Sequence, residues 1–264
     1  MKIGILTLRL FKNYGGILQN YALSRFLQKN GYDVETINIV WSYQLNGVKK
    51  YFVWLKRLVR NMLIGKWYSL DEEKILRNNE LVAAQRVNAF KEKNIPLSQK
   101  VYSLPGADFS DISNKYDTII VGSDQVWRPK YTGGIEKYFL SFADNRIKKI
   151  AYSASFGTDK NEYSFYEKWV CGKLIKRFDA ISVREESAIS LIREQLHWDV
   201  DVIQTLDPTM LLDITDYKSL VGQVVNNNKI FVYILDSSVQ KISFVEKLEK
   251  VLCCLLYTSP SPRD

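Results

Sequence analysis

The sequence predicts an α/β fold built on a doubly wound parallel sheet, and three features carry this prediction. Short apolar segments, such as residues 2–8 and 117–121, read as buried strands. Segments with apolar residues at helical spacing lie between them, so strands and helices alternate along the chain. A continuous apolar strand such as residues 117–121 is typical of a parallel sheet that helices cover on both faces.

The expected elements follow in order from the N-terminus. A strand over residues 2–8, a helix over 16–30 and a strand over 34–39 form the first unit, in which Gly31 ends the helix. A basic, aromatic-rich helical insertion is expected at about residues 41–99. The later elements are strand 117–121, strand 148–157, helix 162–178, a strand turning directly into a helix over 179–196, and a strand running into a loop over 200–212.

Two domains are expected. Residues 1–213 form one Rossmann-like α/β domain, and residues 214–253 form a polar linker and the start of a second, incomplete domain of the same kind. When residues 254–264 (CLLYTSPSPRD) are back-translated, the string resembles a sequencing-library adapter. We therefore expect this tail to be foreign to the natural protein, whose own chain would continue beyond residue 253.

Composition limits the class of protein and of site. No run of about 18 apolar residues occurs and the N-terminus lacks the features of a signal peptide, so we expect a cytoplasmic protein without a membrane span. The three cysteines, Cys171, Cys253 and Cys254, have no CxxC spacing. The single histidine, His197, excludes a multi-histidine metal site within this chain and reads as a surface residue, so no metal is predicted.

The formal net charge of +8 raises the question of an anionic partner. Nucleic acid is not favoured, because lysines and arginines are spread along the whole chain. The densest basic segment, residues 49–67 from Lys49 to Trp67, carries apolar residues at helical spacing between its basic ones. It reads either as a helix packed on its own domain or as a peripheral contact with the inner face of a membrane.

Polar and small residues gather after each predicted strand, at the edge of the sheet where open parallel folds bind ligands. These residues are, strand by strand, Asn13, Tyr14, Gly15, Gly16 and Gln19; Gly122, Ser123, Asp124, Gln125, Trp127 and Arg128; Ser153, Ala154, Ser155, Phe156 and Gly157; Arg184, Glu185, Glu186 and Ser187; and Asp207, Pro208 and Thr209.

Small residues occupy two of these strand ends. Gly15 and Gly16 would let backbone N–H groups approach an anionic or oxygen-rich ligand at a helix N-terminus, and a tight turn alone is the other explanation. Ser153 and Ser155 either line the crevice or let a helix pack closely. Neither GxGxxG nor GxxxxGK[ST] occurs, so neither a dinucleotide site nor a P-loop is supported.

The segment GSDQVW, residues 122–127, delivers a hydroxyl, a carboxylate, an amide and an indole to the end of a buried strand. This combination suits a sugar, because Ser123, Asp124 and Gln125 offer hydrogen bonds while Trp127 offers a flat apolar face. Asp124 is also the candidate general base for a sugar hydroxyl. The alternative is that Asp124 caps the following helix.

Arg184 ends another predicted strand. Its guanidinium offers a two-pronged donor to a carboxylate or a phosphate, which makes it a candidate for an anionic substrate. The alternative is an ion pair with one of the acidic residues Glu185, Glu186 and Asp207.

Five segments, NYGGILQNYAL, YDTIIVGSDQVWRP, YSASFG, ISVREES and LDPT, in that order resemble the polysaccharide pyruvyl transferase family. The resemblance covers residues 2 to about 212 and is weaker from Phe231 onward. It implies two Rossmann-like domains that face each other across a cleft, as in GT-B glycosyltransferases. It also implies transfer of a pyruvyl group from phosphoenolpyruvate to hydroxyls of a sugar in a surface polysaccharide or its lipid-linked precursor, without a metal or bound cofactor.

The resemblance also implies roles for particular residues. The matched residues are Asn13, Gly15, Gly16 and Gln19 in the N-terminal loop, Gly122, Ser123, Asp124, Gln125 and Trp127 in the signature assigned to the acceptor sugar, and Arg184 for the donor. The family's further donor-binding Arg and His belong to the second domain, and His197 does not replace them.

Two other functions are compatible with the sequence. One is a nucleotide-sugar glycosyltransferase of the same architecture, because a shared fold does not fix the chemistry. The other is a non-catalytic glycan-binding or membrane-associated protein.

Overall fold

The computed structural model describes residues 1–11, 13–41, 85, 87–103, 109, 112, 114–221, 229–232, 234, 238–252 and 255–258. The chain divides into two compact units, Met1–Leu212 and Asp213–Asp264, and each is described by itself. No helix within the described ranges is both long and apolar enough to cross a bilayer.

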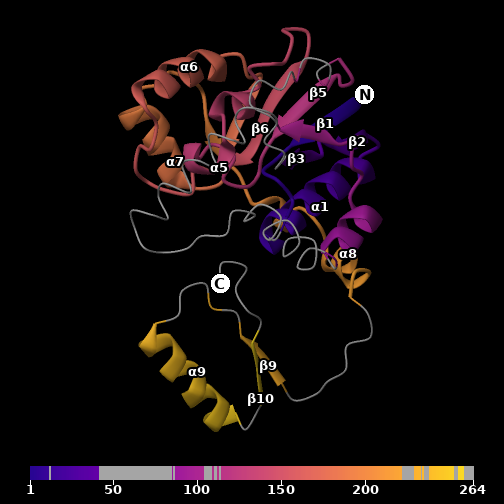
Figure 1. The fold of residues 1–264 in the computed structure, drawn as a ribbon, viewed down its shortest axis with the longest axis vertical. Coiled ribbons are helices and arrows are strands. Elements are labelled where there is room, and N and C mark those ends of the chain that lie inside the picture. The colour runs from indigo at the N-terminus through magenta and orange to yellow at the C-terminus, as the bar shows by residue number, and fades with distance from the viewer. Residues whose placement is uncertain are drawn as a thin grey trace, which may run out of the picture. The chain divides into compact units, whose positions relative to one another are not determined.

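A six-stranded parallel sheet organises the first unit (Figure 1). Its strands stand in the order β2-β1-β5-β6-β7-β8, and every neighbouring pair is parallel. The strands are β1 (Lys2–Leu6), β2 (Asp33–Thr36), β5 (Thr118–Val121), β6 (Lys148–Ala154), β7 (Ala180–Val183) and β8 (Ile203–Gln204). From β1 the chain continues to β2 on one side, and the later strands β5 to β8 lie on the other side. The carboxyl ends of β1 and β5 therefore form a topological switch point. The prediction of an α/β fold on a parallel sheet is confirmed.

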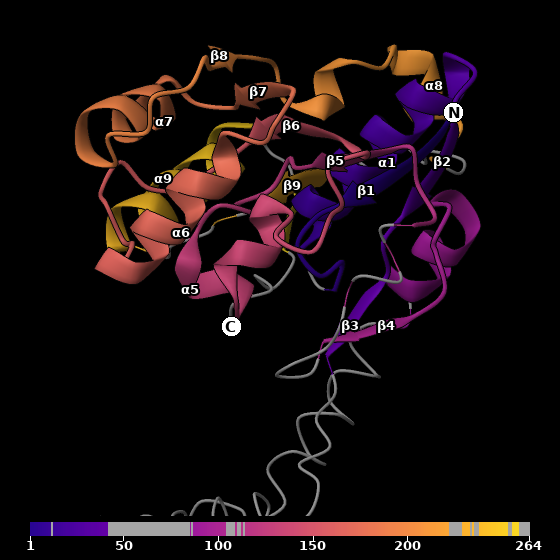
Figure 2. The same cartoon turned by 90° about the horizontal axis from the view of Figure 1, so that it is seen from above.

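Helical segments connect the strands. They are α1 (Tyr14–Lys29) between β1 and β2, α5 (Pro129–Thr132) and the 3-10 helix η1 (Ile135–Phe139) between β5 and β6, α6 (Phe165–Ile175) between β6 and β7, and α7 (Glu186–Ser190) with the π-helical η2 (Leu191–Gln195) between β7 and β8. Both views place α6 and α7 beside the β6–β7 half of the sheet and α1 beside the β1–β2 half (Figure 1, Figure 2).

The two faces of the sheet belong to two separate cores. Alternate residues of a strand point to opposite faces, and β5 shows the consequence. Ile120 lies in a small core with Ile3 of β1 and Leu23 of α1. Val121, the next residue, lies in the larger core with Cys171 of α6. Burial on both faces explains why β5 reads as one continuous apolar run.

Helix α1 begins and ends where its capping residues dictate. Asn13 is the N-cap, and its Oδ1 accepts a hydrogen bond of 3.2 Å from the backbone N–H of Gly16. The helix ends at Lys29, and Gly31 then takes φ +83°, a left-handed conformation that glycine adopts without strain. The predicted stop at Gly31 is confirmed.

Several element boundaries differ from the prediction. The expected strands 2–8 and 148–157 end early, at Leu6 and Ala154, and the expected helix 162–178 ends at Ile175. The expected strand 34–39 is divided into β2 and β3 (Ile39–Trp41), and β3 pairs in parallel with β4 (Val101–Ser103). The expected helix 162–178 begins only at Phe165, because Ser164 and Glu167 form a capping box in which each side chain bonds the other's backbone N–H. The predicted insertion at 41–99, with the basic segment 49–67, lies largely outside the described residues.

The second unit contains α8 (Ile214–Lys218), β9 (Lys229–Val232), α9 (Val239–Leu252) and β10 (Leu255–Thr258). Strands β9 and β10 pair in parallel, with Lys229 opposite Leu255. This β-α-β arrangement is the smallest unit of a parallel sheet. The strand β10 lies within the segment 254–264. The foreign origin of that segment and a complete second Rossmann-like domain both stay predictions.

Candidate active site

The carboxyl edge of the sheet gathers side chains from five segments far apart in the sequence. The hydrogen-bonded residues at this edge are Asn13 and Gln19 from the start of the first unit, Asp124 and Gln125 after β5, Ser155 and Gly157 after β6, Arg184 and Glu185 after β7, and Asp207 after β8. The predicted convergence of polar residues on one edge is therefore what the structure shows.

Asp124 is held in place by its neighbours and is half-buried. Its Oδ2 accepts a hydrogen bond of 2.9 Å from Asn13 Nδ2, and its Oδ1 accepts one of 2.8 Å from the backbone N–H of Gln125. The next helix, α5, has Arg128 as its N-cap and no side-chain cap. Asp124 is thus not a helix cap, and its carboxylate is fixed against the N-terminal loop.

Gly16 lies directly against this carboxylate. A Cβ added at Gly16 would stand 2.7 Å from Asp124 Oδ2 and 3.1 Å from Asn13 Nδ2. The N–H of Gly16 is already bonded to Asn13, so the glycine serves close packing of the loop on Asp124. A Cβ at Gly15 would meet only Asn13 Oδ1, at 3.3 Å.

Arg184 sits between two carboxylates. Its Nε lies 3.3 Å from Glu185 Oε2 and its Nη1 lies 3.6 Å from Asp207 Oδ2, while Nη2 donates to Ser155 Oγ at 3.1 Å. Both ion pairs exceed the 2.7–2.9 Å typical of strong charge-assisted hydrogen bonds. The Arg184 side chain keeps 27% of its surface exposed. The arginine is therefore oriented by its neighbours and still has donor groups for a ligand.

Glu185 and Asp207 were not predicted as site residues. Glu185 Oε1 accepts from Ser155 Oγ at 2.6 Å and from the backbone N–H of Phe156 at 3.2 Å. Asp207 accepts from Gln19 Nε2, which ties α1 to the end of β8. Their position after two strands placed both among the edge residues in the sequence, where these acids read as ion-pair partners of Arg184 or as turn residues and not as substrate-binding groups.

The prediction that Trp127 stacks on a sugar is wrong for this structure. Trp127 is fully buried, and its ring stacks on Phe139 with centroids 5.0 Å apart. Its Nε1 donates to the backbone carbonyl of Tyr138 at 3.2 Å. The indole belongs to the large core, because a wide apolar ring gains most by full burial there.

The serines and Gln125 form the inner layer of the edge. Ser123, Ser153 and Ser155 are all buried, and the hydroxyls of Ser123 and Ser153 find no hydrogen-bond partner among the described residues. Gln125 Oε1 accepts from Arg128 Nη1 at 3.1 Å. These predicted substrate-binding side chains lie at the edge, with Ser155 and Gln125 already bonded within the protein.

Gly122 is required by space as well as by conformation. It has φ +141°, and an added Cβ would stand 2.0 Å from the backbone oxygen of Tyr152. No larger residue fits between strands β5 and β6 at this point.

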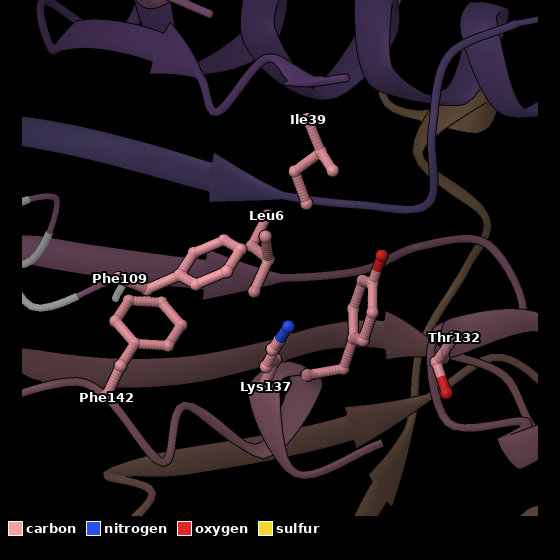
Figure 3. Close-up of a pocket in the computed structure, with 7 residues that line it drawn as sticks. Leu6, Ile39, Phe109, Thr132, Lys137 and Phe142 are labelled. Atoms are coloured by element: carbon pink, nitrogen blue, oxygen red, sulfur yellow. The ribbon is translucent and has the colours of Figure 1, made fainter. Parts of the chain in front are cut away.

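A small cavity opens behind the end of β1 (Figure 3). Leu6, Phe109, Lys137 and Phe142 are among its lining residues, and Figure 3 shows the rings of Phe109 and Phe142 side by side near Leu6. Its volume of about 10 Å³ holds at most one water molecule. The cavity is too small for a sugar or for phosphoenolpyruvate.

The edge carries acidic side chains as well as a guanidinium. Glu185 and Asp207 supply two carboxylates beside the guanidinium of Arg184, and Asp124 supplies a third carboxylate on the other side of β6. Burial, and secondarily the nearby Asp124 carboxylate, raise the pKa of Tyr138 above its usual value, so Tyr138 stays protonated at neutral pH. Within the described ranges, no group of three or more His, Cys, Asp or Glu side chains is placed to hold a metal ion.

Comparison with known proteins adds one strong match. A family model described as polysaccharide pyruvyl transferase matches residues 13–259. No curated protein sequence matches the chain. Two solved structures of an alpha-glucosyltransferase, both in complex with UDP and a 13-mer DNA containing an HMU base, resemble it at 13% identity with a TM-score of 0.48. They match 95% and 99% of this chain, which spans only 55% and 58% of theirs.

Proposed function

The chain belongs to the polysaccharide pyruvyl transferase family, and on this premise we propose that it moves a pyruvyl group from phosphoenolpyruvate to hydroxyls of a sugar. The proposed acceptor is a surface polysaccharide or its lipid-linked precursor. Phosphoenolpyruvate is the co-substrate, and the proposal assigns no step to a metal or bound cofactor.

The observation that carries the proposal is the placing of Asp124 and Arg184 on either side of β6. Ser155 links them, because its backbone N–H donates to the Asp124 carbonyl at 3.3 Å while its Oγ accepts from Arg184 at 3.1 Å. Two strand spacings amount to about 10 Å, which is room for a three-carbon donor and an acceptor hydroxyl between a base and a cation.

The chemistry assigns each of these two groups one task. Asp124 accepts the proton of a sugar hydroxyl as the hydroxyl oxygen bonds to C2 of phosphoenolpyruvate. C3 gains a proton, and phosphate leaves C2 with its bridging oxygen as a second hydroxyl oxygen bonds to C2 and completes the ketal. The proton of this second hydroxyl leaves with the phosphate, so that one of the two hydroxyl protons is balanced by the proton gained at C3 and the other by hydrogen phosphate. Arg184 binds the carboxylate or phosphate of the donor. The group that protonates C3 is not assigned.

The guanidinium of Arg184 already faces the carboxylates of Glu185 and Asp207, so it does not by itself neutralise the charge of the donor. The proposal therefore also requires the Arg and His that the family resemblance implies for the second domain. Their task would be to offset the charge of the phosphate as it departs.

The test is acceptor-dependent release of phosphate from phosphoenolpyruvate by the protein with a complete second domain, which would supply that Arg and His, with a panel of oligosaccharides and mass spectrometry of each acceptor. We expect phosphate release to require both substrates and one acceptor to gain the mass of a pyruvyl ketal. Absence of release with every acceptor, or phosphate release without a modified acceptor, would contradict the proposal.

A further inference from the structure

The outer face of α6 exposes three aromatic side chains. Phe165 has 89% of its surface exposed, Tyr166 has 68% and Trp169 has 55%. The opposite face of the helix is buried, with Cys171 and Ile175 in the large core. The helix is thus apolar on both sides, and the core explains only one of them.

A groove of about 370 Å³ runs beside these rings. Phe165 and Trp169 line it together with Trp198, whose indole Nε1 donates to the Lys168 carbonyl at 3.1 Å. Gly172 makes this possible, because an added Cβ would stand 2.7 Å from Trp198 Nε1. Trp198 is therefore packed closely against α6 on one side of the groove.

Positive charge surrounds the same face. Lys168, Lys173 and Lys176 all line the groove, and Lys173 Nζ lies 3.6 Å above the ring of Trp169. The only acidic residue of α6 is Glu167, whose Oε2 is bonded to the N–H and hydroxyl of Ser164. The aromatic face is thus bordered by cations, with the carboxylate of the helix held at its start.

We propose that this surface, made by the exposed face of α6 and the adjoining groove, docks on an anionic lipid bilayer. Aromatic rings with lysines beside them suit the boundary between acyl chains and headgroups, where the rings enter the apolar layer and the ammonium groups meet anionic headgroups. Phe165, the most exposed ring, has no polar atom with which to bind a soluble polar ligand. The positive charge of this face is complementary to the negative charge of an anionic membrane.

The surface also lies at a useful place in the fold. Helix α6 follows β6, so its first residues, Phe165 and Tyr166, stand near the carboxyl edge that carries Asp124 and Arg184. A bilayer held there would bring a lipid-borne sugar towards that edge. The docking itself does not rest on the proposed transfer reaction, and its test does not use it.

The test is flotation of the full chain with vesicles of phosphatidylcholine alone and of phosphatidylcholine mixed with phosphatidylglycerol. We expect binding to the mixed vesicles only, weakened by salt. The double variant Phe165→Ser/Trp169→Ser should lower the partition coefficient at least about tenfold, because two rings no longer enter the apolar layer. Lys173→Gln/Lys176→Gln should lower it about fivefold for each lysine.

Matched controls lie elsewhere on the first unit. Tyr32→Ser removes an exposed ring, and Lys115→Gln/Lys148→Gln removes two exposed lysines next to the starts of β5 and β6. Both controls should float as wild type does, and thermal melts should show all variants folded. Failure to float, equal flotation of every variant, or a change only in self-association by sedimentation would overturn the proposal.

Discussion

At the scale of single residues, Asp124 is the group on which the proposed chemistry depends. Asn13 and the backbone of Gln125 orient its two oxygens, and Gly16 leaves the space that the carboxylate fills. An oriented and half-exposed carboxylate is what a general base for a sugar hydroxyl requires.

Asp124→Asn should therefore lower pyruvyl transfer by about a hundredfold to ten-thousandfold, because the amide keeps the size of the side chain and cannot accept the proton. The melting temperature should change little. The measurement is the rate of acceptor-dependent phosphate release, with Asp159→Asn, at an exposed position after β6, as the control. A rate within a few-fold of wild type would remove Asp124 from the mechanism.

The sequence predicted the position of some site residues and not of others. It predicted that Asp124 and Arg184 lie at the carboxyl edge, where the structure has them, because residues after strands of a parallel sheet share one edge. It misplaced Trp127, because one sequence cannot tell whether a ring after a strand faces a crevice or the core. It did not choose Asp207 as a site residue, because the partner of Asp207, Gln19, is 188 residues away along the chain. It did not choose Glu185 either, because Glu185 reads as an ion-pair partner of its neighbour Arg184.

At the scale of elements, the junction of β5 and β6 is controlled by Gly122. Its positive φ and the 2.0 Å approach of the Tyr152 oxygen leave no room for a side chain. Gly31 also has a positive φ, but no atom lies within 4 Å of an added Cβ. A substitution at Gly31 therefore measures the free-energy cost of the backbone conformation alone, without a steric clash.

Gly31→Ala should lower the free energy of unfolding by about 1 kcal/mol, the usual cost of a left-handed conformation. Gly122→Ala should cost clearly more, about 3 kcal/mol or above, because backbone atoms must also move. Urea unfolding of both variants measures the difference. Equal losses would show that the strands part easily at Gly122.

A group of ion pairs around Glu162 connects the loop after β6 to α5. Arg128 holds Glu162 through two hydrogen bonds of 3.0 Å, and Lys130 adds one of 2.8 Å. These bonds, that of Arg128 first, lower the pKa of Glu162 to about 2. Arg128 also donates to Gln125, so the pair supports the candidate site.

Glu162→Gln should lower the free energy of unfolding by about 1–2 kcal/mol at neutral pH. Because the pKa of Glu162 is depressed in the folded state, its contribution is complete above about pH 4.5 and disappears as the pH falls towards 2. Urea unfolding across this range should show the gap between wild type and variant closing. If the difference in unfolding free energy between wild type and variant stayed constant with pH, the ion pairs of Glu162 would contribute nothing. Glu194→Gln, at an exposed position, is the control.

Element by element, the sequence predicted the order of strands and helices well. Strands such as β5 were found within a residue, because burial on both faces makes them uniformly apolar. The start of α6 was missed by three residues, since the capping box at Ser164 outweighs the apolar periodicity that continues before it.

At the scale of the whole molecule, the core lies in one unit. Every buried hydrophobic residue among those described falls between Ile3 and Val202. The first unit, Met1–Leu212, therefore contains the material for a cooperative fold of its own.

A fragment of residues 1–212 should unfold in urea in a single transition, with a midpoint close to that of the full chain. A fragment of residues 1–178, which lacks β7 and the core residues of η2, should not fold. Circular dichroism across a urea series measures both. A fragment 1–212 without a cooperative transition would show that the first unit depends on the rest of the chain.

The central claim is that phosphoenolpyruvate binds at the carboxyl edge through Arg184, and titration calorimetry of the full chain tests it most directly. We predict that wild type and Arg146→Gln, which removes an arginine whose side chain is 82% exposed, bind phosphoenolpyruvate alike. Arg184→Gln should weaken binding about tenfold or more, since a charge-assisted contact is lost. Absence of binding by wild type, or equal binding by all three proteins, would contradict the claim.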